Sequence, residues 1–278
     1  MIDVLFTADF GRRALVAATV VGVVAPVVGA FLVQRRLSLV GDGIGHLALA
    51  GVAIGALVGI SGLWGALAVA LLGAVLLEAL RVRGRLTGDL SLALIFYLGI
   101  ATGAVGLSLA GRFDTSILGV LFGTLFALTW ADVGTIALLG AVVLAAVLTL
   151  YRPLLAVALD EETARAGGLP VDLLNLVLVG MTALLVVGGM RVVGLLMVAA
   201  LMVVPVAAGS KVAHSFRTTL RWAVGVGAAS AWVGLIVAAW HGELVPGGTI
   251  VLTAMVAFVG FALVGRRTAV GHRPRRTA

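Results

Sequence analysis

The sequence has no cysteine among its 278 residues, and only 11% of its residues are charged. The lack of cysteine excludes both disulfides and thiolate metal ligands. Soluble domains carry charge on about a quarter of their residues, so this chain cannot present a water-soluble surface. A Gly-x-x-x-x-Gly-Lys-Ser/Thr phosphate loop is also missing from the sequence, and the chain is therefore not expected to hydrolyse ATP or to be an enzyme.

Hydrophobic residues make up 62% of the chain, and the mean hydropathy is +1.23. About 20 apolar residues cross a bilayer as a helix, and the apolar runs here are too long and unbroken for barrel strands. The sequence therefore predicts an all-α transmembrane bundle of about eight or nine spans. Those spans are expected at 14–33, 44–61, 63–80, 91–110, 132–150, 171–189, 192–208, 221–240 and 247–264.

One further apolar run, residues 116–130, is short and interrupted by glycine. Such a segment is typical of a re-entrant piece or a half helix, which a membrane protein tolerates only where other parts of the protein bury it. Whether it crosses the membrane stays open at this point.

The charges give the predicted orientation. The net charge is +7, from eighteen arginines and one lysine against twelve acids. Basic groups at 34–36, 81–85, 151–153, 211–221 and in the tail fall at alternate ends of the spans, which makes that side cytoplasmic. The N-terminus is then outside and the C-terminus inside, in a plasma or inner membrane. The arginines that do not fit this rule are Arg12, Arg13, Arg112 and Arg191.

The domain organisation is expected to be simple. Residues 1–265 form a single transmembrane domain, because the loops are too short to fold alone, and no cleavable signal precedes the first span. Residues 266–278 are basic, contain proline, and are expected to be a disordered cytoplasmic tail.

The stretch RLSLVGDGIGHLALAGVAIG, residues 36–55, places Asp42 and His46 four positions apart within an apolar run. In a helix that begins near Gly41, both side chains lie on one face, one turn apart. A carboxylate and an imidazole so placed can share a divalent cation, and a two-fold dimer would supply two of each. Without thiolates, Mn, Fe(II) or Zn fits better than Cu(I). The alternative is that Asp42 caps the helix and His46 packs against it.

The stretch LDEETARAGGLPVDLLN, within the longest polar insertion at 151–171, predicts a short helix between two spans. Acids at the first turn and glycine at the end are typical helix boundaries. It is either an ordinary solvated connector or a docking helix for a cytosolic partner. The residues concerned are Asp160, Glu161, Glu162, Ala164, Gly167, Gly168 and Pro170.

Other polar residues have weaker functional interpretations. Glu78 is expected to pair with Arg81 rather than to bind an exiting ion. Asp114 and Asp132 either attract cations or cap helices, and His241 with Glu243 forms either an exposed turn or an entry site. The methionines on two successive spans are interpreted as core filler rather than as a thioether lining; they are Met181, Met190, Met197 and Met202.

Three separated stretches resemble the zinc/manganese/iron permease family of ABC importers. RRLSLVGDGIGHLALAGVAIG is similar to the second-helix signature of that family, although Gly43 and Gly45 stand where the family often has Ala and Ser. LDEETARAGGLPVDLLN resembles its coupling loop, and RVVGLLMVAALMVVPVAAGS at 191–210 resembles its Val-Gly-x-Leu-Leu pattern. The three stretches occur in the family's order and extend over most of the chain.

The resemblance implies a fold similar to the vitamin B12-type importers, with eight or nine helices in each of two permease copies. It implies that Asp42 and His46 handle the transported Mn, Zn or Fe and that residues 160–170 contact a cytosolic ATP-binding protein. It also implies an extracytoplasmic solute-binding protein that delivers the metal. No permanently bound cofactor and no nucleic acid are expected, and ATP is bound only by the partner.

Two other functions remain as alternatives. An ion-coupled secondary transporter would act without an ATPase, but it usually needs buried acids in several spans and internal repeats, which are scarce here. An intramembrane metallohydrolase would need at least three ligands and a general base, and no His-Glu-x-x-His motif occurs.

Overall fold

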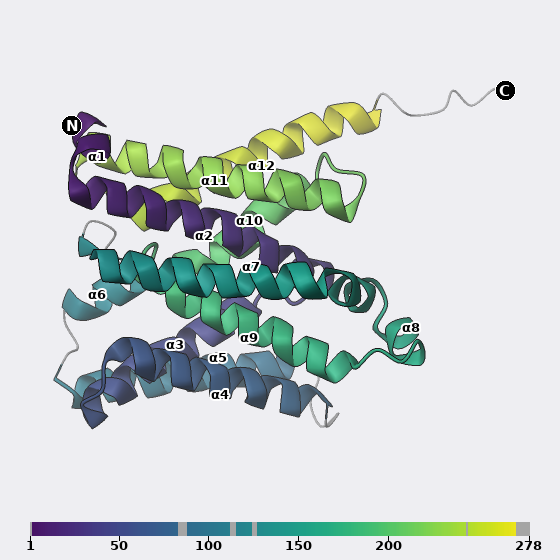
Figure 1. Cartoon of the computed structure of the whole chain (residues 1–278), viewed down its shortest axis with the longest axis horizontal. Coiled ribbons are helices and arrows are strands. Elements are labelled where there is room, and N and C mark those ends of the chain that lie inside the picture. The colour runs from purple at the N-terminus through teal and green to yellow at the C-terminus, as the bar shows by residue number, and fades with distance from the viewer. Residues whose placement is uncertain (1, 83–87, 112–114, 124–126, 243, 271–278) are drawn as a thin grey trace.

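The computed structural model describes residues 2–82, 88–111, 115–123, 127–242 and 244–270. Helices dominate this described part, which contains no β-strand (Figure 1). They are α1 (Ile2–Thr7), α2 (Asp9–Gln34), α3 (Val40–Val58), α4 (Gly62–Val82), α5 (Gly88–Leu109), α6 (Thr115–Phe122), α7 (Trp130–Leu159), α8 (Glu161–Ala166), α9 (Val171–Met190), α10 (Leu195–Gly209), α11 (Phe216–His241) and α12 (Pro246–Val270).

Eight of these helices are long and apolar enough to cross a membrane, and they confirm the predicted all-α transmembrane bundle. They are α2, α3, α4, α5, α7, α9, α11 and α12. The span predicted at 192–208 is wrong in its length. The corresponding helix, α10, has only 15 residues, which gives it a length of about 22 Å at 1.5 Å per residue, against the ~30 Å hydrocarbon core.

Among the described residues of 116–130, no helix is long enough to cross the membrane. The helical part of this segment, α6, has eight residues, about 12 Å long, and it lies at the same end of the molecule as the start of α7 (Figure 1). Gly123, after α6, and Gly194, before α10, both have positive φ, +81° and +90°. A Cβ on Gly194 would lie 2.3 Å from the Leu121 carbonyl oxygen, so the two helix breaks fit together only as glycines.

Helix α7 extends further than predicted. The sequence suggests that the helix ends near residue 150 and that a loop begins with Tyr151-Arg152-Pro153, but α7 continues to Leu159 with Pro153 inside it. Proline removes one helical hydrogen bond and does not by itself end a helix that packing supports. Leu154 and Val157 are each only 3% exposed, and their packing in the core holds the last two turns of α7 in place.

The helices form two groups that α9 and α10 join. In one group α3 packs against α4 and α5, and in the other α2 packs against α7 and α11, with α12 against α11. Close approach depends on small residues. A Cβ on Gly51 of α3 would lie 2.3 Å from the Gly65 carbonyl oxygen of α4, so these two backbones are in direct contact.

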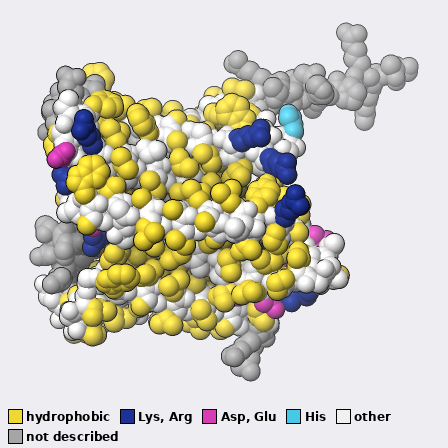
Figure 2. All heavy atoms as spheres, in the orientation of Figure 1, with side chains coloured by type: hydrophobic (Ala, Val, Ile, Leu, Met, Phe, Trp, Pro, Cys, Tyr) yellow, Lys and Arg dark blue, Asp and Glu magenta, His cyan; other side chains and the backbone are white. Residues whose placement is uncertain are grey.

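The surface has an apolar belt between two charged ends. In Figure 2 the hydrophobic side chains cover the middle of the visible face, and the charged side chains lie toward its two ends. One end carries α1 and α6, and the other carries α8 and the connection between α10 and α11 (Figure 1). With eight apolar helices, this is a multi-pass membrane protein. Residues 271–278 of the predicted tail lie outside the described residues.

Candidate functional site

Asp42 and His46 both project from the first two turns of α3. The helix begins at Val40 and has no break, so the four-residue spacing places the two side chains one turn apart, as predicted. The predicted alternative, that Asp42 caps this helix, is wrong. The N-cap is Leu39 and no side chain caps the helix, since Asp42 lies already inside the first turn.

The two side chains line one pocket of about 410 Å³ between α3 and α5. The other lining residues are Leu39, Leu92, Ala93, Phe96 and Tyr97. The Phe96 ring stands edge-on to the His46 ring, with 4.5 Å between ring centroids and 74° between planes. His46 Nδ1 is buried and has no hydrogen-bond partner in the described part of the chain. A buried imidazole nitrogen without a partner is costly unless a ligand binds it.

Close packing of α5 fixes the position of His46. A Cβ on Gly99 would lie 2.6 Å from the backbone carbonyl carbon of His46, so α5 contacts the α3 backbone at this turn. Gly43 and Gly45 stand where the family often has larger residues. A Cβ on Gly43 would lie 2.9 Å from the Leu92 side chain of α5, and a Cβ on Gly45 would lie 3.2 Å from the Leu195 side chain of α10. These glycines therefore serve close helix packing.

Within the described residues, the pocket holds one carboxylate and one imidazole. Among the described residues no group of three or more His, Cys, Asp or Glu side chains is close enough to hold a metal ion. Structural and catalytic metal sites usually need three or four protein ligands. The pocket lies beside an exposed apolar face of α5, where Tyr97 is 67% exposed.

The predicted short helix at 160–170 is confirmed as α8, residues Glu161–Ala166. The Asp160 carboxylate caps it by accepting hydrogen bonds from the backbone N–H groups of Glu162 and Thr163 and from the Thr163 hydroxyl, at 3.0, 3.1 and 2.5 Å. These bonds, led by the Thr163 hydroxyl, lower the pKa of Asp160 below its ordinary value. The helix ends at Gly167, and Gly168 reverses the chain with φ of +83°.

A partly buried polar network, which the sequence interpretation missed, ties α8 to the end of α2 and to α9. Arg35 ends α2, its side chain is 6% exposed, and it donates to Glu161 at 2.6 Å and to the amide oxygen of Asn175 on α9. Burial lowers the pKa of Arg35, and Glu161 partly offsets this effect. Asn175 is a polar residue inside an apolar span, and that position was the available signal in the sequence.

Arg165 strengthens the same attachment. It pairs with Asp172 at the start of α9 at 2.6 Å, and this contact raises the pKa of Arg165. Residues 35–39 then lead directly from Arg35 into α3, through a turn in which Arg36 has φ of 58°. The segment that holds Asp42 is thus joined through one tight turn to a residue that binds α8.

The remaining candidates have structural roles where the chain is described. Glu78 pairs with Arg81 at 3.1 Å, as predicted. Asp132 caps α7 through a capping box with Thr129 and also pairs with Arg191, which explains an arginine that the sequence left without a partner. The four methionines belong to or pack against the hydrophobic core. His241 is exposed; Glu243 and Asp114 lie outside the described residues.

The fold defines a multi-pass membrane protein, and near one end of the bundle a pocket is lined by one carboxylate and one imidazole. The chain belongs to the ABC 3 transport family, because the family model matches residues 7–265. This confirms the resemblance that the three sequence stretches indicate.

Relatives and solved structures agree with this family. The manganese import system permease protein ScaB of Streptococcus pneumoniae is 30% identical over 93% of this chain and 91% of its own length. The manganese transport system membrane protein MntC of Halalkalibacterium halodurans is 28% identical over 92% and 87%. Among structures, PsaBC from Streptococcus pneumoniae, solved with a Fab, has a chain with a TM-score of 0.86, 28% identity and 98% coverage of both chains.

Proposed function

We propose that this chain is the permease subunit of an ATP-driven importer of divalent metal ions. Its family and its similarity along nearly the full length to manganese import permeases support this proposal. The observation that carries it is the pocket between α3 and α5, which Asp42 and His46 both line; among the described residues, the buried Nδ1 of His46 has no hydrogen-bond partner.

The ligand chemistry favours Mn²⁺, Fe²⁺ or Zn²⁺. Carboxylate and imidazole suit hard and borderline ions, and the cysteine-free chain offers no thiolate for Cu(I). Manganese comes first among the three because ScaB and MntC, two similar proteins, are named as manganese import or transport proteins.

A homodimer completes the proposed site. Two chains related by a two-fold axis beside the exposed face of α5 would bring together two Asp42 and two His46 side chains, a set of four ligands. One chain alone offers two, and two ligands hold a metal weakly.

The energy comes from a partner in this proposal. The chain has no phosphate loop, so a cytosolic ATP-binding protein docks on α8, with contacts from the segment between Asp160 and Pro170. A solute-binding protein delivers the metal at the opposite end, where α1 and α6 lie. The α8 end is then cytoplasmic, in agreement with the distribution of basic residues, and α12 ends inside the cell.

Metal uptake into proteoliposomes that contain the permease and its ATP-binding protein tests this proposal. Asp42→Asn and His46→Ala should each lower ATP-dependent uptake of radioactive Mn²⁺ more than about tenfold, since even second-shell changes at metal sites cost about 10–100-fold. Asp9→Asn and His214→Ala change the same residue types at exposed positions outside the pocket, and they should leave uptake unchanged. Wild-type uptake rates in both pocket variants would refute the site.

The same vesicles separate the importer from a secondary transporter. Uptake should require ATP and the partner protein, and an imposed proton or sodium gradient should not replace them. Uptake by the permease alone, driven by such a gradient, would refute the proposed energy source.

A further inference from the structure

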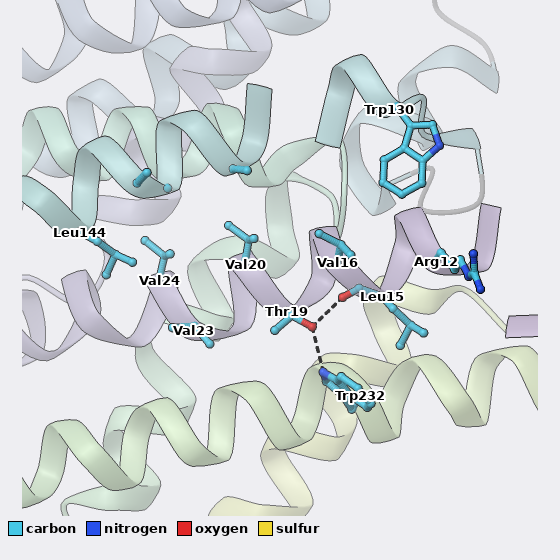
Figure 3. A pocket seen from close by; sticks show the side chains of 13 residues that line it. Arg12, Leu15, Val16, Thr19, Val20, Val23, Val24, Trp130, Leu144 and Trp232 are labelled. Carbon is cyan, nitrogen blue, oxygen red and sulfur yellow. Dashed lines mark hydrogen bonds between the residues drawn. The ribbon is translucent and has the colours of Figure 1, made fainter. Parts of the chain in front are cut away.

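A second hollow lies on the flank formed by α2, α7 and α11, away from the Asp42 pocket. It is an open groove of about 770 Å³. Figure 3 shows α2 along its floor, with Val16, Val20 and Val24 pointing toward α7 on one side and Trp232 of α11 on the other. Neither the family resemblance nor the proposed transport mechanism uses this groove.

The length of the groove along α2 is close to the thickness of the hydrocarbon layer of one membrane leaflet. Arg12 marks one end and Val24 the other (Figure 3), and the twelve helical rises from Arg12 to Val24 correspond to about 18 Å along α2. Half of the ~30 Å hydrocarbon core is about 15 Å. Arg12 lies in the first turn of α2, at the end of the molecule that carries α1 and α6, so the groove runs from this membrane surface to about the bilayer centre.

The deep part of the groove is lined by hydrocarbon. Its few polar groups are already satisfied: Trp232 donates its indole N–H to the Thr19 hydroxyl at 2.9 Å, and Thr19 donates to the Leu15 carbonyl at 2.6 Å. Gly140 and Ala141 of α7 leave room where larger side chains would fill the space. In a bilayer such a hollow accepts an acyl chain, since water there would find no free hydrogen-bonding group.

The shallow end carries a cation. Arg12 is exposed, its Nε donates to the Phe6 carbonyl at 3.1 Å, and no carboxylate pairs with it in the described part of the chain. Trp130 lies at the same end of the groove, where aromatic side chains favour the headgroup level (Figure 3). A guanidinium binds phosphate by paired hydrogen bonds.

From this arrangement we propose that the groove is a phospholipid-binding site. One acyl chain lies along α2 between α7 and α11, and the Arg12 guanidinium binds the phosphate of the same lipid. The lipid comes from the leaflet on the side of α1 and α6. It fills the wedge between α7 and α11, which both pack on α2, and so stabilises the contact of these helices.

Native mass spectrometry of the purified chain, released from detergent after titration with phosphatidylglycerol, tests the proposal. Wild-type protein should retain one tightly held lipid per chain. Arg12→Gln should weaken its binding about fivefold, the effect of about one basic residue on an anionic lipid. Arg13→Gln is the matched control: it removes the same charge from the same turn, and Arg13 does not line the groove.

A second pair of variants tests the acyl chain. Ala137→Phe places a ring in the groove and should abolish the tightly held lipid, whereas Ala145→Phe adds the same bulk at an exposed position of α7 outside the groove. Circular dichroism and gel filtration confirm that each variant is folded.

The outcomes are decisive in both directions. Equal lipid retention by wild type, Arg12→Gln and Ala137→Phe would overturn the proposal, and loss with Ala137→Phe alone would overturn the assignment of the phosphate to Arg12. If Ala137→Phe instead dissociates a dimer and leaves lipid retention unchanged, the groove is an interface between two copies and the proposal is wrong. Metal uptake is not a readout, so the result is independent of the transport proposal.

Discussion

Glu161→Ala provides a sharp test of how α8 is attached to the rest of the permease. In the structure Glu161 binds Arg35, whose side chain is 6% exposed, at 2.6 Å, while Glu161 itself is 39% exposed. Removal of the carboxylate leaves a buried guanidinium with Asn175 as its remaining partner. The neighbouring Glu162 lies on the same helix, is exposed, and forms no ion pair in the described residues, so Glu162→Ala is the matched control.

The expected magnitude lies between those of buried and surface pairs. Removal of one partner of a fully buried ion pair costs about 3–5 kcal/mol, and exposed pairs contribute about 0–1 kcal/mol. Because one partner is buried and the other is more than a third exposed, we expect Glu161→Ala to cost about 1–2 kcal/mol. Glu162→Ala should change the unfolding free energy by less than about 0.5 kcal/mol.

Thermal unfolding in the same detergent measures this difference. About 2–4 °C per kcal/mol is typical of chains of 150–250 residues, so Glu161→Ala should melt a few degrees below Glu162→Ala. If α8 transmits ATPase movement through Arg35, Glu161→Ala should also hydrolyse more ATP per metal ion imported. Equal melting temperatures and equal ATP-to-metal ratios for the two variants would refute the proposed role of the network.

Three further predictions concern other contacts. Gly99→Ala should lower metal uptake and stability, because its Cβ would lie 2.6 Å from the His46 backbone. Gly180→Ala is the control and should be neutral, because nothing lies within 4 Å of a Cβ at that position. Uptake and melting assays compare the two variants. Arg191→Ala should destabilise the start of α7 by about 1 kcal/mol, because Asp132 keeps its capping bonds and loses only its ion partner; hydrogen exchange at residues 130–135 measures the change. The cap of α8 should weaken in acid. Because the folded pKa of Asp160 is lowered, its stabilisation is fully present above the ordinary value of 3.8 and is lost as the pH falls through the lowered pKa. Because the chain has no cysteine, the variant Glu162→Cys can carry a single spin label. This label should become more mobile as the pH falls through that range, and the additional substitution Asp160→Asn should remove the pH dependence.

Much of this fold could be predicted from apolar runs and helix boundaries. Hydropathy located the eight long helices, because a helix that crosses a bilayer needs a continuous apolar surface, whether that surface faces lipid or packs against other helices. The acids at 160–162 and the glycines at 167 and 168 located α8, because capping is a local property of the chain. The shared face of Asp42 and His46 followed from the regular helix that contains them.

Tertiary contacts account for what the sequence could not predict. The run 192–208 is as apolar as a full span, and its helix starts late because Gly194 fits against the end of α6, some 70 residues earlier. Pro153 suggested a helix end that core packing of Leu154 and Val157 overrides. The partners of Arg35 and Arg191 are far away in sequence, at Glu161 and Asp132. No local pattern contains such pairs.

The proposed site at Asp42 and His46 and the attachment of α8 together fit a transporter that must both capture and release its ion. In the proposed dimer four ligands meet when two α3 helices approach, and two remain to each chain when they separate. The turn at 35–39 joins α3 to Arg35, and Arg35 is bound to Glu161 of α8. In the proposed mechanism, a displacement of α8 by the ATP-binding protein either breaks this ion pair, in which only Arg35 is buried, or moves the start of α3. In the proposed dimer, a movement of α8 that keeps this pair intact displaces the start of α3 together with Asp42, and so changes the number of ligands around the metal.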